Sequence, residues 1–273
     1  MTLCRPSIAD IWAKYDDVES RLTAPVSERM LDLAELRPGM RVIDIASGRG
    51  EPSLRAACRV GPQGHVLGVD ISDSLLAMAR AKAVAQSISN IEFRTGDADS
   101  LDGVADGSFG AATARWGLGS TPSPRRALES IHRVLEPSGV LVAAFWADLD
   151  RVPWASLARR TLRAYRDVPE MDPDVPGAFR YADPSRIFRD FGESGFTIER
   201  IEEIEIPVIE AATAEEIVAW TRDLGLARLA EELPLEQHAA WATALAREIE
   251  QFRVGDMIRL GGLTRLVVGR RAP

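Results

Sequence analysis

The sequence R-V-I-D-I-A-S-G-R-G, residues 41–50, decides the fold class of this chain. Its first half is rich in β-branched residues and nearly continuous in apolar character, which is typical of a strand buried on both faces. Gly48 and Gly50 follow, and Pro52 then opens an apolar stretch with helical spacing. Proline suits the first turn of a helix because its missing N–H has no partner there. The pattern predicts a strand, a tight glycine turn and a helix, which together form a cofactor-binding corner.

The residues around this turn discriminate between two kinds of cofactor. A dinucleotide-binding turn has the pattern G-x-G-x-x-G, in which the third glycine allows close packing of the helix on the strand. Position 53 is Ser53 instead, and the acidic Asp44 precedes the turn. A carboxylate there suits a positively charged ligand better than a pyrophosphate. A nicotinamide oxidoreductase is therefore disfavoured, although it stays an alternative.

Strands and helices alternate through the rest of the first half of the chain. Helices are predicted after Pro52, at 71–87 and at 124–135, and strands at 65–70, 91–95, 109–115 and 140–146. Repeated β-α units imply right-handed crossovers and a parallel sheet. We expect an α/β fold, a doubly wound and mostly parallel seven-stranded sheet with helical insertions that cover it.

Four polar residues fall where successive strands of this sheet end. They are Asp44, Asp70, Asp97 and Arg115. In open α/β sheets ligands bind outside the carboxyl ends of the strands, beside the point where the strand order reverses. The sequence thus predicts a ligand site at these four residues.

The flanking segments are less regular. Before the glycine turn we expect a helix capped by Ser7 that extends to about residue 22, and a second helix at 25–36. After residue 147 we expect helices at 153–166, near 184–194, at 213–233 and at 234–252, an edge strand at 196–209, and a last strand at 264–269 after a bend at Gly261 and Gly262.

These segments predict one domain with two insertions. Residues 1–147 hold the N-terminal helices and the cofactor-binding core, and residues 195–273 supply the last two strands. The insertions are 148–194 and, within the final part, 210–255. Loops of such length in a compact domain are usually functional. We expect the insertions to form a mobile cover over the acceptor.

Composition excludes several classes of partner. The chain has 273 residues and a net charge of −8, so nothing favours nucleic acid or an anionic membrane surface. No apolar run approaches the roughly 20 residues of a membrane span. The first 22 residues are charged and do not resemble a signal peptide. The two cysteines are too few for a disulfide framework, so we expect a reducing compartment, the cytoplasm. The three histidines form no metal-binding pattern.

Several motifs together resemble class I S-adenosylmethionine-dependent methyltransferases of the quinone-biosynthesis and small-molecule natural-product branch. Residues 44–50 resemble their acidic-x-G-x-G-x-G motif, with Ala46 in place of the first glycine. G-D-A at 96–98, A-R-W-G-L-G at 114–119 and R-V-L-E-P-S-G at 133–139 match further family segments. The resemblance covers about residues 10–147.

The resemblance implies S-adenosylmethionine as the cofactor and assigns residues to its parts. Its methionine end is expected on the loop that contains Ala46, Ser47, Gly48 and Gly50, with Asp44 serving the ammonium group. Asp70, followed by Ile71, would accept hydrogen bonds from the ribose hydroxyls. Gly96, Asp97 and Ala98 would meet the adenine, and Arg115 and Trp116 would lie beneath the sulfonium.

The resemblance further implies methyl transfer to oxygen or carbon of a small-molecule metabolite of secondary metabolism. The acceptor itself is not written in the chain, and assembly into homo-oligomers stays open. One alternative is a family member that binds S-adenosylmethionine but catalyses another reaction, such as a cyclisation.

Two side chains are candidates for a general base. Histidine ordinarily titrates near neutral pH, so His238, on a helix of the presumed cover, is preferred over Tyr15 on the N-terminal helix. His65 and His132 are expected to lie far from the cofactor. The competing interpretation, which is favoured, is that His238 and Tyr15 pack in the core with a satisfied polar tip.

Overall fold

The computed structural model describes residues 8–224, 230 and 232–273. The expected cap Ser7 lies outside the described residues. The chain divides into two compact units. Unit 1 comprises Met1–Thr23, Ala147–Asp172 and Glu205–Leu263, and unit 2 comprises Ala24–Trp146, Pro173–Ile204 and Thr264–Pro273. The boundary between Asp172 and Pro173 divides the segment that the sequence suggests as one insertion, 148–194.

A mostly parallel sheet has the order β3-β2-β1-β4-β5-β8-β6, and β7 additionally pairs with β8. Neighbouring strands among β1 to β5 pair in parallel, whereas β8 runs antiparallel to β5. This confirms the predicted fold class and the edge position of the strand that begins at Phe196. The strands are β1 (Arg41–Ile45), β2 (His65–Asp70), β3 (Ile91–Thr95), β4 (Phe109–Arg115), β5 (Leu135–Trp146), β6 (Phe196–Ala211), β7 (Arg253–Val254) and β8 (Met257–Arg271).

The helices are α1 (Ile8–Leu33), α2 (Ser53–Val60), α3 (Asp73–Ala85), α4 (Pro124–Val134), α5 (Pro153–Leu162), α6 (Pro184–Glu193), α7 (Ala214–Asp223) and α9 (Leu235–Ile249). Helices lie within the predicted ranges after residue 50, although α5 ends at Leu162, and the predicted helix 213–233 includes residues 225–229 and 231, which lie outside the described residues. Short 3₁₀ turns lie at η1 (Leu118–Ser120), η2 (Leu149–Arg151) and η3 (Glu250–Phe252).

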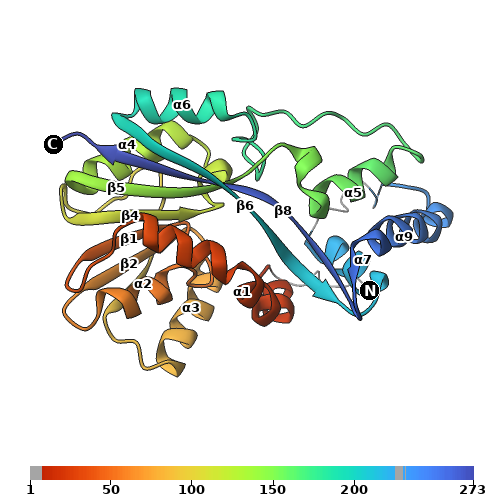
Figure 1. Ribbon diagram of the computed structural model, residues 1–273, viewed down its shortest axis with the longest axis horizontal. Helices are drawn as coiled ribbons and strands as arrows, with labels where there is room; N and C mark the ends of the chain where they lie inside the picture. Colours follow the sequence, from red (N-terminus) through yellow and green to blue (C-terminus); the bar gives the residue numbers. More distant parts are fainter. Residues whose placement is uncertain (1–7, 225–229, 231) are drawn as a thin grey trace. The chain divides into compact units, whose positions relative to one another are not determined.

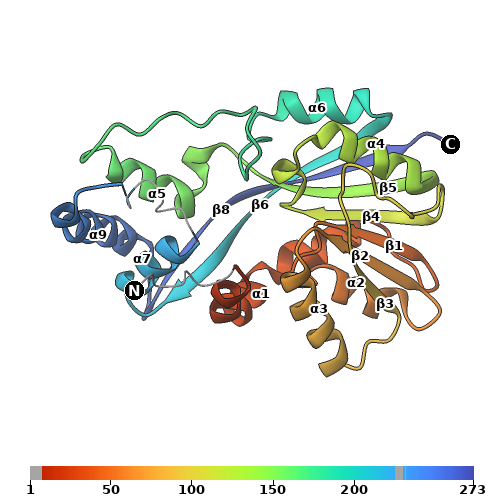
Figure 2. The ribbon, with the colours of Figure 1, turned by 180° about the vertical axis from the view of Figure 1, so that it is seen from behind.

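In unit 2, helices pack on both faces of the sheet (Figures 1 and 2). Buried residues of α4 and α6 pack with Ile43, Ile45 and other apolar residues of β1, β2, β4 and β5. A second cluster joins Leu54 of α2 and Leu76 of α3 to Phe93 of β3. Successive strand residues point to opposite faces. Each face of the sheet in unit 2 is therefore buried against its own pair of helices.

Unit 1 gathers α5, α7 and α9, which contact one another (Figure 1). The Trp154 and Trp220 rings meet edge to face with centroids 6.2 Å apart. Thr213 and Glu216 form a reciprocal capping box at the start of α7, which satisfies two backbone N–H groups that the helix leaves free. Among the helices that the structure describes, none combines the length and apolarity that a bilayer crossing requires.

Three local predictions were wrong. Pro25 lies inside the single helix α1 instead of separating two helices. The strand predicted at 140–146 begins earlier than expected, because β5 starts at Leu135, directly after α4. Gly261 and Gly262 lie within β8 and make no bend there. A Cβ on Gly261 would lie 1.8 Å from the Ile206 carbonyl oxygen, so this glycine serves close backbone approach.

Candidate functional site

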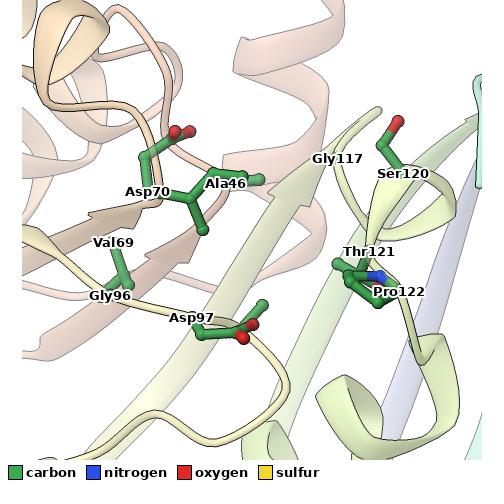
Figure 3. A pocket seen from close by; sticks show the side chains of 11 residues that line it. Ala46, Val69, Asp70, Gly96, Asp97, Gly117, Ser120, Thr121 and Pro122 are labelled. Carbon is green, nitrogen blue, oxygen red and sulfur yellow. The ribbon is translucent and has the colours of Figure 1, made fainter.

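A cavity of about 210 Å³ opens at the carboxyl ends of β1 to β4 in unit 2. Asp70 and Asp97 lie on one side of it, and Ser120, Thr121 and Pro122 on the other (Figure 3). The lining residues are Ala46, Val69, Asp70, Ile71, Gly96, Asp97, Ala98, Gly117, Ser120, Thr121 and Pro122. The structure thus brings together the predicted segments 46, 70–71 and 96–98 in one cavity.

The glycine turn after β1 follows a left-handed path at the base of this cavity. Ala46, Gly48 and Gly50 have φ angles of +54°, +51° and +95°. An L-residue with a Cβ is disfavoured in this region, which explains why the family pattern has glycine at the position of Ala46. The Ser47 amide donates to the Val69 carbonyl oxygen at 3.0 Å and fixes the turn against β2. The Ser47 side-chain oxygen is buried without a hydrogen-bond partner in the described part of the chain.

Asp70 connects the turn to the cavity. One of its carboxylate oxygens accepts the Gly48 amide at 2.8 Å, and the other accepts the Ser72 amide, also at 2.8 Å. Each carboxylate oxygen can accept a further hydrogen bond. Asp70 is therefore held in place by the backbone while it faces the cavity with unused acceptor capacity.

The segment after β3 forms a second polar edge. Asp97 is exposed, and its Oδ1 accepts the Asp99 amide at 2.9 Å, which shapes the turn. Asp99 in turn accepts the Ser123 amide at 3.0 Å with Oδ2, and burial raises the pKa of its carboxyl group. Ile71, which follows Asp70 in the cavity lining, is 76% exposed although it is apolar. An exposed isoleucine beside two carboxylates is suited to a ligand that has both an apolar ring and hydroxyl groups.

Asp44 does not line the cavity. Its side chain is completely buried, and its two oxygens accept hydrogen bonds from the Ser53 hydroxyl and, at 2.7 Å, from the Thr113 hydroxyl. Burial raises the pKa of Asp44 to about 6. The resemblance implies contact between Asp44 and a ligand ammonium, but both carboxylate oxygens are buried on Ser53 and Thr113. Through these two hydrogen bonds Asp44 of β1 instead connects to β4 and to the start of α2.

Arg115 and Trp116 lie beside the cavity without lining it. The Trp116 ring stacks on Trp146 with centroids 4.7 Å apart, and its Nε1 donates to the Thr264 hydroxyl at 2.8 Å. The Arg115 guanidinium lies 4.9 Å from the Trp116 ring centroid, and its Nη1 donates to the Ser27 hydroxyl at 3.2 Å. These contacts hold the segment after β4 so that Gly117 forms the cavity wall.

The two candidate bases lie in unit 1. The His238 Nε2 is 2.9 Å from the Leu233 carbonyl oxygen. The Tyr15 hydroxyl donates to Asp223 at 2.6 Å, and burial together with this hydrogen bond raises the Tyr15 pKa. Both polar tips therefore have partners within unit 1, as the competing interpretation expects. Among the described residues, no cluster of histidine, cysteine or acidic side chains could hold a metal ion.

Gly117 and residues 120–122 complete the cavity wall. Gly117 lies in a matched family segment, whereas residues 120–122 were not predicted as site residues. The matched family segment ends at Gly119, and Ser120, Thr121 and Pro122 follow it directly. The available signal was the turn sequence S-T-P itself, since such residues commonly end a strand and begin a helix.

Comparison with known proteins gives a consistent family. A family model described as Methyltransferase domain matches residues 36–188. Nocamycin O-methyltransferase of Saccharothrix syringae is 29% identical, and the alignment covers 95% of this chain and 95% of that enzyme. Demethylmenaquinone methyltransferase of Desulfitobacterium hafniense is 36% identical over 117 residues, which are 42% of this chain and 46% of that enzyme.

Solved structures agree on the fold. The YcgJ protein from Bacillus subtilis has a TM-score of 0.59 and 20% identity, with 90% of this chain and 98% of that chain covered. The cyclase SpnF has a TM-score of 0.58 and 20% identity, with 91% of this chain and 80% of that chain covered. At this level of identity the likeness shows the fold alone.

Proposed function

The chain belongs to the methyltransferase-domain family, and from this premise we propose that it methylates an oxygen atom of a small, partly apolar metabolite. The family and its relatives make the chain an S-adenosylmethionine-dependent enzyme that acts on small molecules. The nicotinamide alternative is thereby set aside. The observation that carries the proposal is the cavity between Asp70 and Asp97, at the carboxyl ends of the parallel strands.

The residues of this cavity fit S-adenosylmethionine. Two hydroxyls of a ribose would find the Asp70 carboxylate, whose oxygens are already oriented by two amides. The adenine would lie between Ile71 and the 120–122 wall, with Asp97 and the Ala98 amide at its polar edge. The buried Ser47 hydroxyl lacks a partner in the described part of the chain and lies in the turn proposed for the methionine end.

We choose oxygen as the acceptor atom because the relatives differ in how much of this chain they align with. The O-methyltransferase from Saccharothrix syringae aligns with 95% of this chain, including its second half. The quinone-biosynthesis enzyme aligns with 42% of this chain. The acceptor is bound by parts of a methyltransferase that vary between substrates, so a relative that matches along the whole chain is the better guide to the acceptor atom.

Methyl transfer needs alignment and, for a hydroxyl acceptor, removal of a proton. S-adenosylmethionine, when bound, supplies a methyl group on a positively charged sulfur. A carbonyl oxygen only accepts, so His238 directs an Nε2–H toward Leu233, and Nδ1 is then the proton-accepting nitrogen of its neutral ring. We keep His238 as the proposed base. Tyr15 is less suited because its hydroxyl donates to Asp223 and its raised pKa opposes ionisation.

We also propose that residues 148–194 and 210–255 close over the acceptor, and that the enzyme works in the cytoplasm without nucleic-acid partners. The net charge of −8 supports the last point, since phosphate contacts dominate nucleic-acid affinity. Digestion within 167–184 should slow when cofactor and acceptor are both present. Equal digestion with and without them would refute the cover.

The activity is tested by incubation with S-adenosylmethionine and a panel of phenols and enolic polyketides. The proposal expects release of S-adenosylhomocysteine and a product heavier by one methylene, with the methyl group on oxygen. A rearranged product of unchanged mass without S-adenosylhomocysteine would instead identify a cyclase-type reaction. Methylation at carbon would refute the proposed acceptor atom while leaving the family intact.

A further inference from the structure

A loop of unit 2 is fastened to the outer side of the cavity wall. The Gly177 amide donates to the Gly119 carbonyl oxygen at 2.9 Å. The Arg180 Nη1 donates to the Thr121 carbonyl oxygen, also at 2.9 Å. We call these two contacts the clasp. Thr121 and its neighbour Ser120 line the cavity, so each contact ends on or directly beside a lining residue.

The two backbones meet more closely than a side chain permits. A Cβ built on Gly119 would lie 2.7 Å from the Gly177 carbonyl oxygen and 3.6 Å from the Arg180 Cβ. A Cβ built on Gly177 would meet nothing within 4 Å. Glycine is thus required at 119 by the clasp, while alanine fits at 177. Gly119 itself is buried and is not a lining residue of the cavity.

The loop is anchored on either side of an exposed stretch. Arg186 of α6 donates to the Pro173 carbonyl oxygen at 2.9 Å. Tyr181 is buried, with its hydroxyl donating to Asp190 at 2.9 Å. Between these anchors Val175 is 56% exposed. The clasp is accordingly what connects this exposed part of the loop to the cavity.

We propose that the clasp couples cofactor binding to the position of the loop at 173–182, with Gly119 and Arg180 as positioning residues. This inference rests on the proposed function, because it takes the cavity as the cofactor site and the loop as part of the cover. A ligand that orders residues 120–122 orders the loop through the clasp. By linkage, a loop detached from the wall weakens cofactor binding by the same factor. Bound cofactor then prepares the loop for the acceptor.

The test compares Gly119→Ala with Gly177→Ala, which add the same methyl group on opposite sides of one hydrogen bond. Calorimetry with S-adenosylhomocysteine should show about tenfold weaker binding for Gly119→Ala, within the range of typical coupling, and binding within about twofold of wild type for Gly177→Ala. Hydrogen exchange of the 173–182 peptide should slow on ligand addition in wild type and Gly177→Ala but not in Gly119→Ala.

The outcomes distinguish a failure of the clasp proposal from a failure of the cofactor-site assignment. If wild type does not bind S-adenosylhomocysteine, the proposed function fails and the coupling with it. If all variants bind alike and the ligand protects the peptide alike, the cofactor site stands and the clasp is refuted. Should Gly119→Ala not fold, Arg180→Leu decides in its place, since it removes the bond to Thr121 without adding a collision. Its expected signature is the same loss of ligand-dependent protection.

Discussion

The Cβ of Ala46 occupies the space that a side chain at residue 117 would need, because a Cβ built on Gly117 would lie 2.2 Å from it. Ala46 stands where the family pattern has glycine, and it belongs to the turn after β1, whereas Gly117 follows β4. Both residues line the cavity (Figure 3), and the space between them holds one methyl group. The alanine in the cofactor motif is thus accommodated by a glycine on a neighbouring strand end.

This relationship predicts a compensating pair. Gly117→Ala should weaken S-adenosylhomocysteine binding at least tenfold, because two methyl carbons at 2.2 Å force one strand end to move. Adding Ala46→Gly should restore binding, since the next nearest atom to a Cβ at 117 is 3.6 Å away. Calorimetry measures both, with Gly192→Ala in open space as the control. A double variant as weak as Gly117→Ala would refute the shared space.

A second prediction concerns the buried Asp44. Its pKa is raised from 3.8 to about 6 in the folded protein, so the folded state holds this proton more tightly than the unfolded chain does. At about 1.4 kcal/mol per pKa unit, the difference is worth about 3 kcal/mol. The stabilising contribution is fully present below pH 3.8 and is lost as the pH rises through about 6.

The measurement is the free energy of unfolding of wild type and Asp44→Asn between pH 4 and pH 7. Wild type should lose stability relative to the variant by about 2.4 kcal/mol over this interval, most of the full difference, because the amide does not titrate. Other groups titrate alike in both proteins and cancel in the difference. Parallel pH profiles would show that Asp44 stays charged, for instance through the nearby Arg115.

If His238 is the base, its replacement should lower turnover without weakening cofactor binding. His238→Ala should lower kcat about 10²-fold, the usual contribution of a general base, with S-adenosylhomocysteine affinity unchanged. Glu236→Ala, on the same turn of α9, is the matched control. Near-normal turnover of His238→Ala on the true acceptor would refute His238 as the base.

We expect Tyr15 to contribute to the stability of the fold and not to catalysis. Tyr15→Phe removes the hydrogen bond to Asp223, which also accepts Lys14 at 2.9 Å. A hydrogen bond to a charged group contributes about 1.5–3 kcal/mol, and the partial exposure of this one places it at the lower end. Denaturant unfolding should show the loss while turnover stays within about twofold. A large fall in turnover at unchanged stability would instead make Tyr15 the base.

The sheet could be predicted because its strands are local signals. The β-branched run before Gly48 and the strands 91–95 and 109–115 are bounded by turn residues, and their limits agree with the structure. Features that depend on distant contacts could not be predicted. Pro25 stays inside α1, and Gly261 lies within β8, where it allows approach to Ile206. The contact of Gly261 with Ile206 is not visible in sequence spacing.

The same distinction holds at the site. Asp70, Gly96, Asp97 and Ala98 could be placed because Asp70 ends one strand and the other three directly follow another, and all line the cavity. Asp44 has the same pattern but is buried, since Ser53 and Thr113 lie on other elements that the sequence does not place beside it. The roles of Gly117 and Gly119 arise from contacts with residues far along the chain.

The central claim is that the cavity beside Asp70 binds S-adenosylmethionine, and calorimetry with S-adenosylhomocysteine tests it most directly. Wild type should bind, and Asp70→Ala should bind at least tenfold more weakly, because each hydrogen bond to the carboxylate contributes about 1.5–3 kcal/mol. Asp102→Ala, an exposed aspartate that does not line the cavity, should bind like wild type. Unchanged affinity of Asp70→Ala would contradict the account and remove Asp70 from the site.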